Sequence, residues 1–495
     1  MQQPLPRTAL LSALLAAPLC AQVDYNDNGY PWTAHASNGP DSVVPGWFYN
    51  LGPTGMRAQL DPERPTHLLV KHVFERTPAA RHVEAGDWIV GVNGVAFETP
   101  HVDGYGMDVF ATRGPLHDFA DALEASYADD DRIELQLERD GKPVSVSLRL
   151  GRQESYAASF PVDCDKSEQQ LEQLLEYVVR HQRDNGSWGR EPQNTFAPLA
   201  LLASGERRYR SNVERAARWH AANTTGPPDE SSLVNWKYMG AAIVLSEYYL
   251  ATGERWVLPE LEEIAAFLHS SQYTDRSQIH PRSPETHPHD QPRDELDRHG
   301  GWGHNPGFEG YGPIAMITAQ GALAFSLMER CGIEIEPERH RAAYAYLERG
   351  TGRNGYLWYG DSVAGQDDWA DTGRTGAAAI AQWLSPFEDE QHRALAMRNA
   401  TLIGEHPESF PDTHASPLMG MGWVAIGAHV DPPSYRRLMD ANRWWFVLAE
   451  AHDGSFCYQP NRDNSNYDSG SRLLASATTA LILSVPQRSL VITGK

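Results

Sequence analysis

The polar residues of the kinds found in enzyme sites gather in loops that each come just before an apolar helix. Carboxylates and imidazoles there can move protons, and aromatic rings beside them can bind a sugar or another polar ligand. The candidates for catalysis are Asp371, His414, Glu309 and Tyr467. The candidates for ligand binding are Trp302, His304, Trp358, Asp367, Asp368, Arg374 and Asp468.

Two kinds of glycan chemistry fit these candidates. Hydrolysis needs two carboxylates roughly 5 to 9.5 Å apart, and Asp371 could form such a pair with Glu309 or Asp468. A lyase would instead use His414 or Tyr467 as its base. His414 follows Asp412 closely, so it is either a base oriented by that carboxylate or a neighbour of a helix cap. Both interpretations stay open.

The segment Asp367-Asp368-Trp369-Ala370-Asp371 resembles the aspartate-rich motif with which class I terpene synthases bind magnesium diphosphate. Those enzymes have a different helical bundle. An acidic loop that ends in a helix cap at Asp371 or Thr372 explains the same residues, and we favour that interpretation.

The segment from Tyr273 to Pro306 is rich in histidine, and its stretch His280 to His304 could bind zinc through imidazole and carboxylate groups. It is also rich in proline, arginine and aspartate, as a mobile surface loop is. We therefore expect no cofactor, with zinc at this insert as the alternative. The chain has no Gly-x-Ser-x-Gly elbow, phosphate loop or HExxH motif, so the mechanisms of those motifs have no support.

Helices must position these loops. Amphipathic helices are predicted from Ser167 and at 209–222, 258–272, 336–350, 388–404 and 432–450. They alternate with helices that are apolar on all sides, predicted at 195–203, 231–250, 311–328, 375–384, 414–428 and 471–483. Six such pairs predict an all-α (α/α)6 toroid over 167–485, with an amphipathic outer layer and a buried inner layer. A helical solenoid also alternates helices, but its helices need not be so apolar. The loops that lead into inner helices lie on one face of a toroid, so we expect the candidate residues to converge there.

Glycine followed by an aromatic residue recurs in four of the turns between paired helices, near residues 186, 301, 355 and 454. The first, Gln182 to Gly189, resembles the repeat of squalene–hopene cyclases and related terpenoid-cyclase or prenyltransferase toroids. That resemblance implies a toroid, with a terpenoid cyclase-like enzyme as our third hypothesis, since the Asp-x-Asp-Asp acid of toroidal cyclases is absent. The turn itself is structural: glycine permits the tight bend and tryptophan packs over helix ends.

Residues 46–150 are predicted to form a separate, mainly-β domain. Strands fit 68–73, 133–137 and 144–148, and a helix fits 116–126. The stretch Gly86 to Gly94 resembles a PDZ domain, which implies capture of a peptide C-terminus as an added strand. The matching peptide-binding residues are Leu51, Gly52, Thr54 and Gly55. Pro53 between them has no N–H to donate, so a packing module for the second domain is an equal alternative.

The remaining segments are a signal peptide at 1–21, an extension at 22–45, a linker at 151–166 and a tail at 486–495. Arg7 before a short apolar run predicts export to the periplasm or outside the cell, with a lipid-anchored form through Cys20 as the alternative. No integral membrane segment is expected. Cys164, Cys331 and Cys457 allow at most one disulfide. The net charge of −23 argues against binding nucleic acid or anionic membrane surfaces.

These features lead to two hypotheses of different classes. The first is an exported binding or scaffold protein, in which the PDZ-like domain contacts a protein or peptide and the toroid holds a glycan or small molecule in a polar-aromatic cavity. The second is a glycan-active hydrolase or lyase on the same loop face. The domain order also resembles an uncharacterised bacterial exported family, which implies no activity. The sequence does not decide whether the protein is an enzyme.

Overall fold

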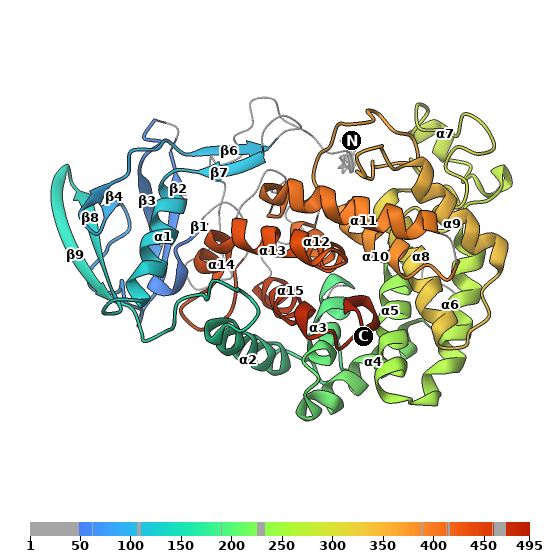
Figure 1. The fold of residues 1–495 in the computed structure, drawn as a ribbon, viewed down its shortest axis with the longest axis horizontal. Helices are drawn as coiled ribbons and strands as arrows, with labels where there is room; N and C mark the ends of the chain where they lie inside the picture. The colour runs from blue at the N-terminus through green and yellow to red at the C-terminus, as the bar shows by residue number, and fades with distance from the viewer. Residues whose placement is uncertain are drawn as a thin grey trace, which may run out of the picture.

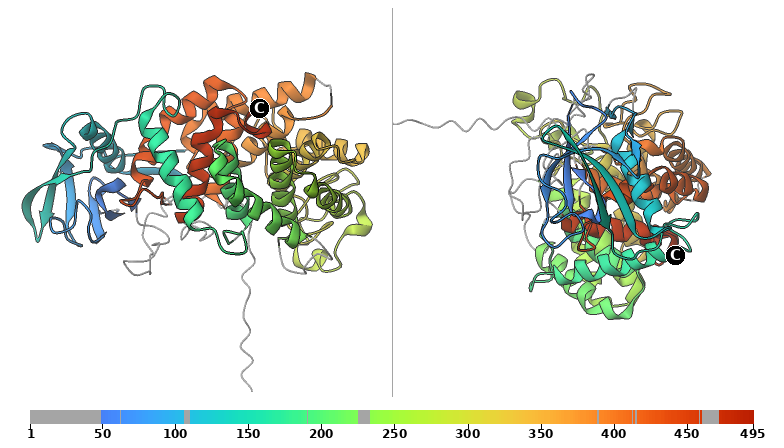
Figure 2. Two further views of the ribbon diagram at one scale, coloured as in Figure 1. Left: turned by 90° about the horizontal axis from the view of Figure 1, so that it is seen from below. Right: turned by 90° about the vertical axis from the view of Figure 1, so that its left-hand side faces the viewer.

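The computed structural model describes residues 49–495 except 62, 106–109, 190, 225–232, 388–389, 412, 414–415, 458 and 460–471. A small β-rich part lies at one end of the molecule and a larger helical part at the other (Figure 1). Figure 2 shows the same division from two further sides.

The β-rich part is built on one antiparallel sheet. The strands are β1 (Tyr49–Asn50), β2 (Met56–Leu60), β3 (Leu68–Val73), β4 (Trp88–Val92), β5 (Val95–Ala96), β8 (Arg132–Arg139) and β9 (Lys142–Arg149). They follow the order β1-β2-β3-β4-β8-β9, with β5 paired to β4. A separate hairpin holds β6 (Val102–Tyr105) and β7 (Phe110–Arg113), and helix α1 (Pro115–Tyr127) packs on β4 and β8. Alternate residues of β8 are buried, so one face of the sheet covers a core.

The helical part has two layers. The outer helices are α2 (Asp165–Arg180), α4 (Arg210–Thr224), α6 (Leu258–Ser271), α9 (Pro337–Arg349), α11 (Glu390–Glu405), α13 (Pro432–Ala441) and α14 (Arg443–Ala449). The inner helices are α3 (Glu191–Ala203), α5 (Val234–Thr252), α8 (Ala315–Arg330), α10 (Gly373–Trp383), α12 (Pro417–Ala428) and α15 (Arg472–Ser484). A short helix, α7 (Ser283–Thr286), lies in the insert before α8.

The inner helices form a closed ring. Each packs against the next in the order α3, α5, α8, α10, α12, α15, and α15 packs in turn against α3 (Figure 1). The last helix of a solenoid would not contact its first. Closure therefore supports the predicted toroid, and the inner helices are buried on nearly every face, as their composition predicts.

The prediction of one helix over 432–450 is wrong. The segment forms two helices, α13 and α14, that meet at Asn442. The Asn442 side chain donates to the carbonyl of Leu438 at 2.8 Å and to the carbonyl of Pro407 at 2.8 Å. A side-chain amide that bonds to nearby backbone carbonyls competes with helical hydrogen bonds, and the helix breaks there.

The glycine-aromatic turns have a structural role, as the sequence predicts: they connect the ends of neighbouring outer helices. Trp302 is fully buried, and its indole N–H donates to the Leu268 carbonyl at 3.0 Å and to the Ser271 hydroxyl at 3.1 Å. Gly300 has a φ of +86°, and a Cβ there would lie 2.2 Å from the Ala342 carbonyl oxygen on the next outer helix. Tryptophan thus binds the end of one outer helix while glycine lets the backbone touch the next.

The C-terminal segment closes the end of the ring where the inner helices finish. Glu247, near the end of α5, accepts from the backbone N–H groups of Val491 at 3.1 Å and Ile492 at 2.8 Å. The side chains of Leu490 and Ile492 are buried. The predicted tail therefore docks on the ring. The opposite end, where the inner helices begin, carries the candidate loops.

The β-rich part and the ring share a buried interface. Asn50 on β1 donates from its side chain to the Glu450 carbonyl at 2.7 Å. Lys166 on α2 is buried and forms an ion pair with Glu124 on α1. The Glu450 carboxylate accepts from Gln170 at 2.8 Å, and burial raises its pKa. Buried polar contacts of this kind require defined partners, so the two parts pack in one arrangement.

The loop predicted to bind a peptide lies inside this interface. Leu51, Gly52, Thr54 and Gly55 are all buried, and the segment Gly52–Thr54 packs against α14. A Cβ at Gly52 would lie 3.1 Å from the Val447 carbonyl oxygen. This placement fits the packing alternative. The PDZ resemblance and peptide capture stay predictions.

Cys164, Cys331 and Cys457 are buried, and all three are free thiols. Among the described helices, none combines the length and the apolar composition needed to cross a bilayer.

Candidate functional site

The candidate site lies where the inner helices begin. Its loops are fixed by the first backbone N–H groups of these helices. The N–H of Asn235 on α5 donates to the His304 carbonyl at 3.0 Å, and the N–H of Ala315 on α8 donates to the Tyr359 carbonyl at 2.8 Å. The amides that open two inner helices therefore hold the two loops in place.

Four half-buried side chains form a connected group that we call the mouth cluster: Trp236, His304, Tyr311 and Tyr359. The Trp236 indole N–H donates to His304 Nδ1 at 2.8 Å. His304 Nε2 is 2.5 Å from the Tyr311 hydroxyl, and the Tyr359 hydroxyl is 3.5 Å from that same oxygen. The cluster joins α5, the loop before α8 and the loop before α10.

The cluster fixes the proton of His304. An indole N–H is a donor and never an acceptor, so Nδ1 of His304 must accept and the neutral ring carries its proton on Nε2. That Nε2–H then donates to the Tyr311 oxygen. Burial lowers the pKa of His304 to about 4, against a smaller opposing effect of Glu309. His304 is therefore neutral at neutral pH.

Asp371 and Arg374 lie behind the cluster as a buried ion pair. Their side chains are 3.3 Å apart, and Asp371 is only 1% exposed. Arg374 also donates to the Tyr356 hydroxyl at 2.7 Å and lies 5.6 Å from the ring centroid of Tyr359. Thr372 is the N-cap of α10, as one of the two sequence alternatives expects. Asp371 thus acts as a counter-ion in this structure, and its carboxylate does not face solvent.

The aspartates that resemble a magnesium diphosphate motif do not form one site. Asp367 and Asp368 are exposed, and Asp367 pairs with Arg353 at 2.8 Å. Asp371 is buried, so the three carboxylates do not share one surface. The acidic-loop interpretation fits. Trp358 donates to the Gly365 carbonyl at 3.1 Å and so fastens this loop.

Glu309 and Trp302 also differ from their predicted roles. Glu309 is exposed, so it does not face Asp371 in a buried pair of carboxylates. Trp302 is fully buried among helix ends, which leaves no indole surface for a ligand. Both predictions rested on residue type and loop position, and neither of these determines burial.

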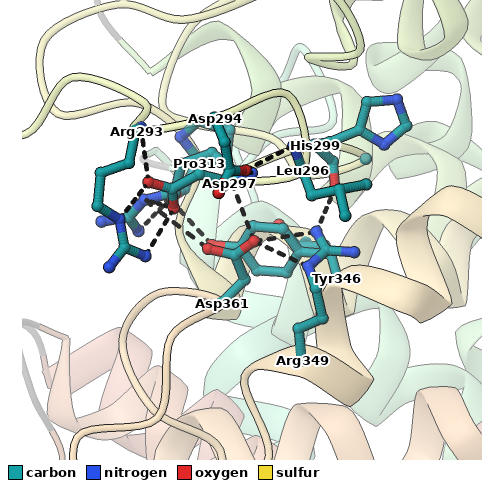
Figure 3. Close-up of polar contacts among 12 residues, drawn as sticks. Arg293, Asp294, Leu296, Asp297, His299, Pro313, Tyr346, Arg349 and Asp361 are labelled. Atoms are coloured by element: carbon teal, nitrogen blue, oxygen red, sulfur yellow. Dashed lines mark hydrogen bonds and ion pairs between the residues drawn. The ribbon is translucent and has the colours of Figure 1, made fainter.

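The histidine-rich insert is fastened by ion pairs rather than loose (Figure 3). Asp361 accepts from the backbone N–H of Arg298 at 2.9 Å and from Arg349 on α9 at 2.9 Å. The same arginine donates to the His299 carbonyl at 2.7 Å, and Arg293 pairs with Asp297 at 2.7 Å. These contacts join the end of the insert to α9 and to the loop before α10. Within the described residues, no three histidine, cysteine or acidic side chains come together as a metal site would require.

Glu191, the first residue of α3, belongs to this face and was missed from the sequence. Burial raises the pKa of its carboxyl to about 7, and the positive charge of Lys237 opposes this rise. Lys237 is in the first turn of α5, the inner helix next to α3 in the ring. The helix was expected to start at Thr195, although Pro192 marks a helix start and could have placed Glu191 in the first turn.

Three further candidates, His414, Tyr467 and Asp468, lie outside the described residues. Both interpretations of His414 therefore stay predictions. So do His414 or Tyr467 as a lyase base and Asp468 as the hydrolytic partner of Asp371.

Residues 167–494 match the model of a family described as "Domain of unknown function (DUF6288)". This match spans most of the helical part. The chain belongs to this family. No curated protein matches this chain.

Solved structures of low sequence identity resemble part of this chain. A GH76 alpha-mannanase from Bacteroides thetaiotaomicron has 10% identity and a TM-score of 0.47, covering 66% of this chain and 97% of its own. The GH76A alpha-1,6-mannanase from Salegentibacter sp. HEL1_6 has 13% identity and a TM-score of 0.47, covering 64% and 98%. A type II terpene cyclase from Scytonema has 14% identity and a TM-score of 0.39, covering 65% and 98%.

Proposed function

We propose that this member of the family is a glycan-cleaving enzyme whose site is the mouth cluster together with Glu191. The mouth cluster carries the proposal. It presents an indole, an imidazole and two phenols, all partly open to solvent, at one end of a closed helical ring. Aromatic faces bordered by hydroxyl and imidazole groups are the surfaces on which sugars bind.

Glu191 supplies the acid that glycosidic cleavage needs. A carboxyl with a pKa of about 7 keeps its proton at neutral pH in a large fraction of molecules. It can therefore protonate the leaving glycosidic oxygen, which is what a general acid must do. Glu191 is the first residue of α3, an inner helix that packs between α15 and α5, so it lies at the same end of the ring as the mouth cluster.

A binding or scaffold role is less well supported than glycan cleavage. It relies on an open peptide-binding loop, and that loop lies against α14. Capture of a peptide or protein by the β-rich part therefore remains only a proposal. Export, with a lipid-anchored form as its alternative, is also a proposal that rests on the sequence of residues 1–21.

The test is a panel of neutral and acidic polysaccharides incubated with the purified protein, with products separated by anion-exchange chromatography. We expect wild type to cleave at least one glycan. Glu191→Gln should lower the rate by roughly 10²- to 10⁴-fold, the usual loss on removing a general acid. Glu262→Gln, an exposed glutamate of α6, is the control and should cleave at the wild-type rate. A panel without any product, or an unchanged rate for Glu191→Gln, would refute the proposal.

A further inference from the structure

The loop between α9 and α10 carries a second group of aromatic side chains, separate from the mouth cluster. Trp358 and Trp369 are both partly exposed, and both pack against a small buried core around Tyr356. This small core is distinct from the main core of the ring. The Trp369 ring also stacks on the imidazole of His406, with ring centroids 3.9 Å apart and an angle of 20° between the planes. We call Trp358, Trp369 and His406 the loop patch.

Arg374 shows how close the loop patch lies to the mouth cluster. Its guanidinium is 6.0 Å from the ring centroid of Tyr356 and 5.6 Å from that of Tyr359, a member of the mouth cluster. The Trp358 ring in turn lies 5.1 Å from the Tyr356 ring, edge to face. The two aromatic groups are therefore neighbours, and one chain of several sugar rings can reach both.

Hydrogen bonds fix the Trp358 ring and the loop that faces it. The indole N–H of Trp358 donates to the Gly365 carbonyl at 3.1 Å, and the Asn354 side chain donates to the Asp368 carbonyl at 3.0 Å. The Asp368 carboxylate lies over Gly365, where an added Cβ would collide with it. A ring that is already held in place loses little conformational freedom when a ligand binds, so this ring is preorganised for contact.

Carboxylates lie beside these rings. Asp367 and Asp368 are exposed, and Glu408 lies 3.5 Å from Nδ1 of His406. Arg353 pairs with Asp367 at 2.8 Å and offsets one of these charges. An ionised carboxylate accepts hydrogen bonds from sugar hydroxyls and repels a carboxylate or sulfate group on a ligand. The loop patch therefore favours an uncharged glycan over an acidic one.

We propose that the loop patch is a second sugar-binding subsite, which holds a neutral glycan of several units as it extends from the mouth cluster. The exposed parts of Trp358 and Trp369 contact sugar C–H groups, and Asp368 accepts hydrogen bonds from sugar hydroxyls. This inference rests on the proposed function, because it takes the mouth cluster as the place of cleavage. The sequence selects Trp358 and Asp368 for ligand binding, and Trp369 is an addition to them.

Migration in native gels that contain a polysaccharide measures binding and does not depend on cleavage. The neutral probes are hydroxyethylcellulose, galactomannan and soluble starch, and polygalacturonate is the charged probe. We expect at least one neutral probe, and not polygalacturonate, to retard the wild-type protein. Trp358→Ala and Trp369→Ala should each raise the dissociation constant roughly three- to tenfold, the loss on removing one ring contact. Trp383→Ala removes a partly exposed tryptophan at the far end of α10, and this control should bind like wild type.

Two further variants separate a binding role from a structural one. Trp369→Phe keeps an aromatic ring against His406, so it should retain most of the binding that Trp369→Ala loses. Asp368→Asn changes an exposed carboxylate, so it should weaken binding roughly three- to tenfold while the melting temperature stays that of wild type. Loss of binding confined to variants that melt at a lower temperature would overturn the subsite.

Failure of the subsite differs from failure of the proposed function. Binding through the loop patch without any cleavage product would leave the subsite standing and refute cleavage. Cleavage by a protein whose binding is unchanged in both alanine variants would overturn the subsite and leave cleavage standing. Equal migration in every gel, or equal retardation by polygalacturonate, would overturn a subsite for neutral glycans.

Discussion

Burial disfavours the charged forms of the Glu191 carboxyl and the His304 imidazole, the two titrating groups of the proposed site. The pKa of Glu191 rises to about 7 and that of His304 falls to about 4, in each case chiefly because of burial. At neutral pH a protonated carboxyl and a neutral imidazole therefore coexist. The residue type alone would predict the reverse for the carboxyl, since an ordinary glutamate is ionised at pH 7.

The pH dependence of cleavage follows from Glu191. An acid must be protonated to act, so kcat should be high below pH 7 and fall as pH rises through about 7. The measurement is kcat from pH 5 to 9 for wild type. A rate that stays constant from pH 6 to 9 would show that Glu191 is not the acid.

His220 gives a stability prediction with a defined sign. It is fully buried on α4, its Nε2 lies 2.9 Å from the Asn194 carbonyl of α3, and burial lowers its pKa to about 4. The unfolded chain takes up a proton at this residue below pH 6.5 while the folded chain does not. Folding stability is therefore lost as pH falls from 6.5 to 4, by on the order of 3 kcal/mol from this residue.

The test is denaturant unfolding of wild type and His220→Gln at pH 7 and at pH 4.5. Gln has no titrating group, so the variant should lose less stability between these pH values than wild type does. Other buried groups, such as Glu247, titrate in both proteins and cancel in the comparison. Equal losses in the two proteins would contradict the assignment.

The sequence predicts that the candidate residues meet on one face, and the structure differs from that expectation in how deeply each of them is buried. Asp371, Trp302 and Glu309 were selected by residue type and loop position. In the structure Asp371 is buried as the counter-ion of Arg374, Trp302 is buried between helix ends, and Glu309 is exposed. Trp236, Tyr311, Tyr359 and Glu191 were not among the sequence candidates, since their contacts depend on residues distant in the chain. His304 was the selected residue that the structure places in the mouth cluster.

The predicted helix bounds agree closely with the structure, because the outer helices carry an apolar stripe and the inner helices are long apolar segments. The expected span 258–272 compares with Leu258–Ser271, and 375–384 with Gly373–Trp383. The break at Asn442 was missed. It depends on the Pro407 carbonyl, a partner from another element that no local pattern reveals.

The glycine-aromatic turns predict different costs for alanine substitution at two glycines. Gly300 and Gly332 share a φ of +86°, but only at Gly300 does an added Cβ meet a neighbour, at 2.2 Å from the Ala342 carbonyl oxygen. Both alanine variants should suffer from the left-handed backbone, at a cost of about 1 kcal/mol. Gly300→Ala should lose at least about 1 to 3 kcal/mol more, because the contact forces two elements apart. Thermal unfolding of the pair gives the difference, and equal melting temperatures would contradict the role of the turn.

For the whole molecule, the packing of the β-rich part against the ring depends on the buried ammonium group of Lys166. Lys166 is 1% exposed, pairs with Glu124, and lies over the rings of Tyr127 at 4.4 Å and Tyr156 at 4.3 Å. The interface was not predictable from periodicity, because Lys166 reads as an ordinary polar residue at the start of an amphipathic helix.

Lys166→Met should destabilise the protein by about 3 to 5 kcal/mol, the usual cost of leaving a buried charge without its partner. Lys142→Met, an exposed lysine of β9, is the control and should change stability by less than about 0.5 kcal/mol. Calorimetry of both variants measures the difference. If Lys166→Met melts like wild type, the charge does not hold the two parts together.

We propose that a glycan binds at the mouth cluster and reaches Glu191. The most direct test of this proposal is a crystal structure of Glu191→Gln with a bound oligosaccharide from the glycan that the panel selects. We expect a sugar ring against Trp236 and Tyr311, with its glycosidic oxygen within hydrogen-bond distance of residue 191. A sugar bound at another surface, with the mouth cluster empty, would contradict it.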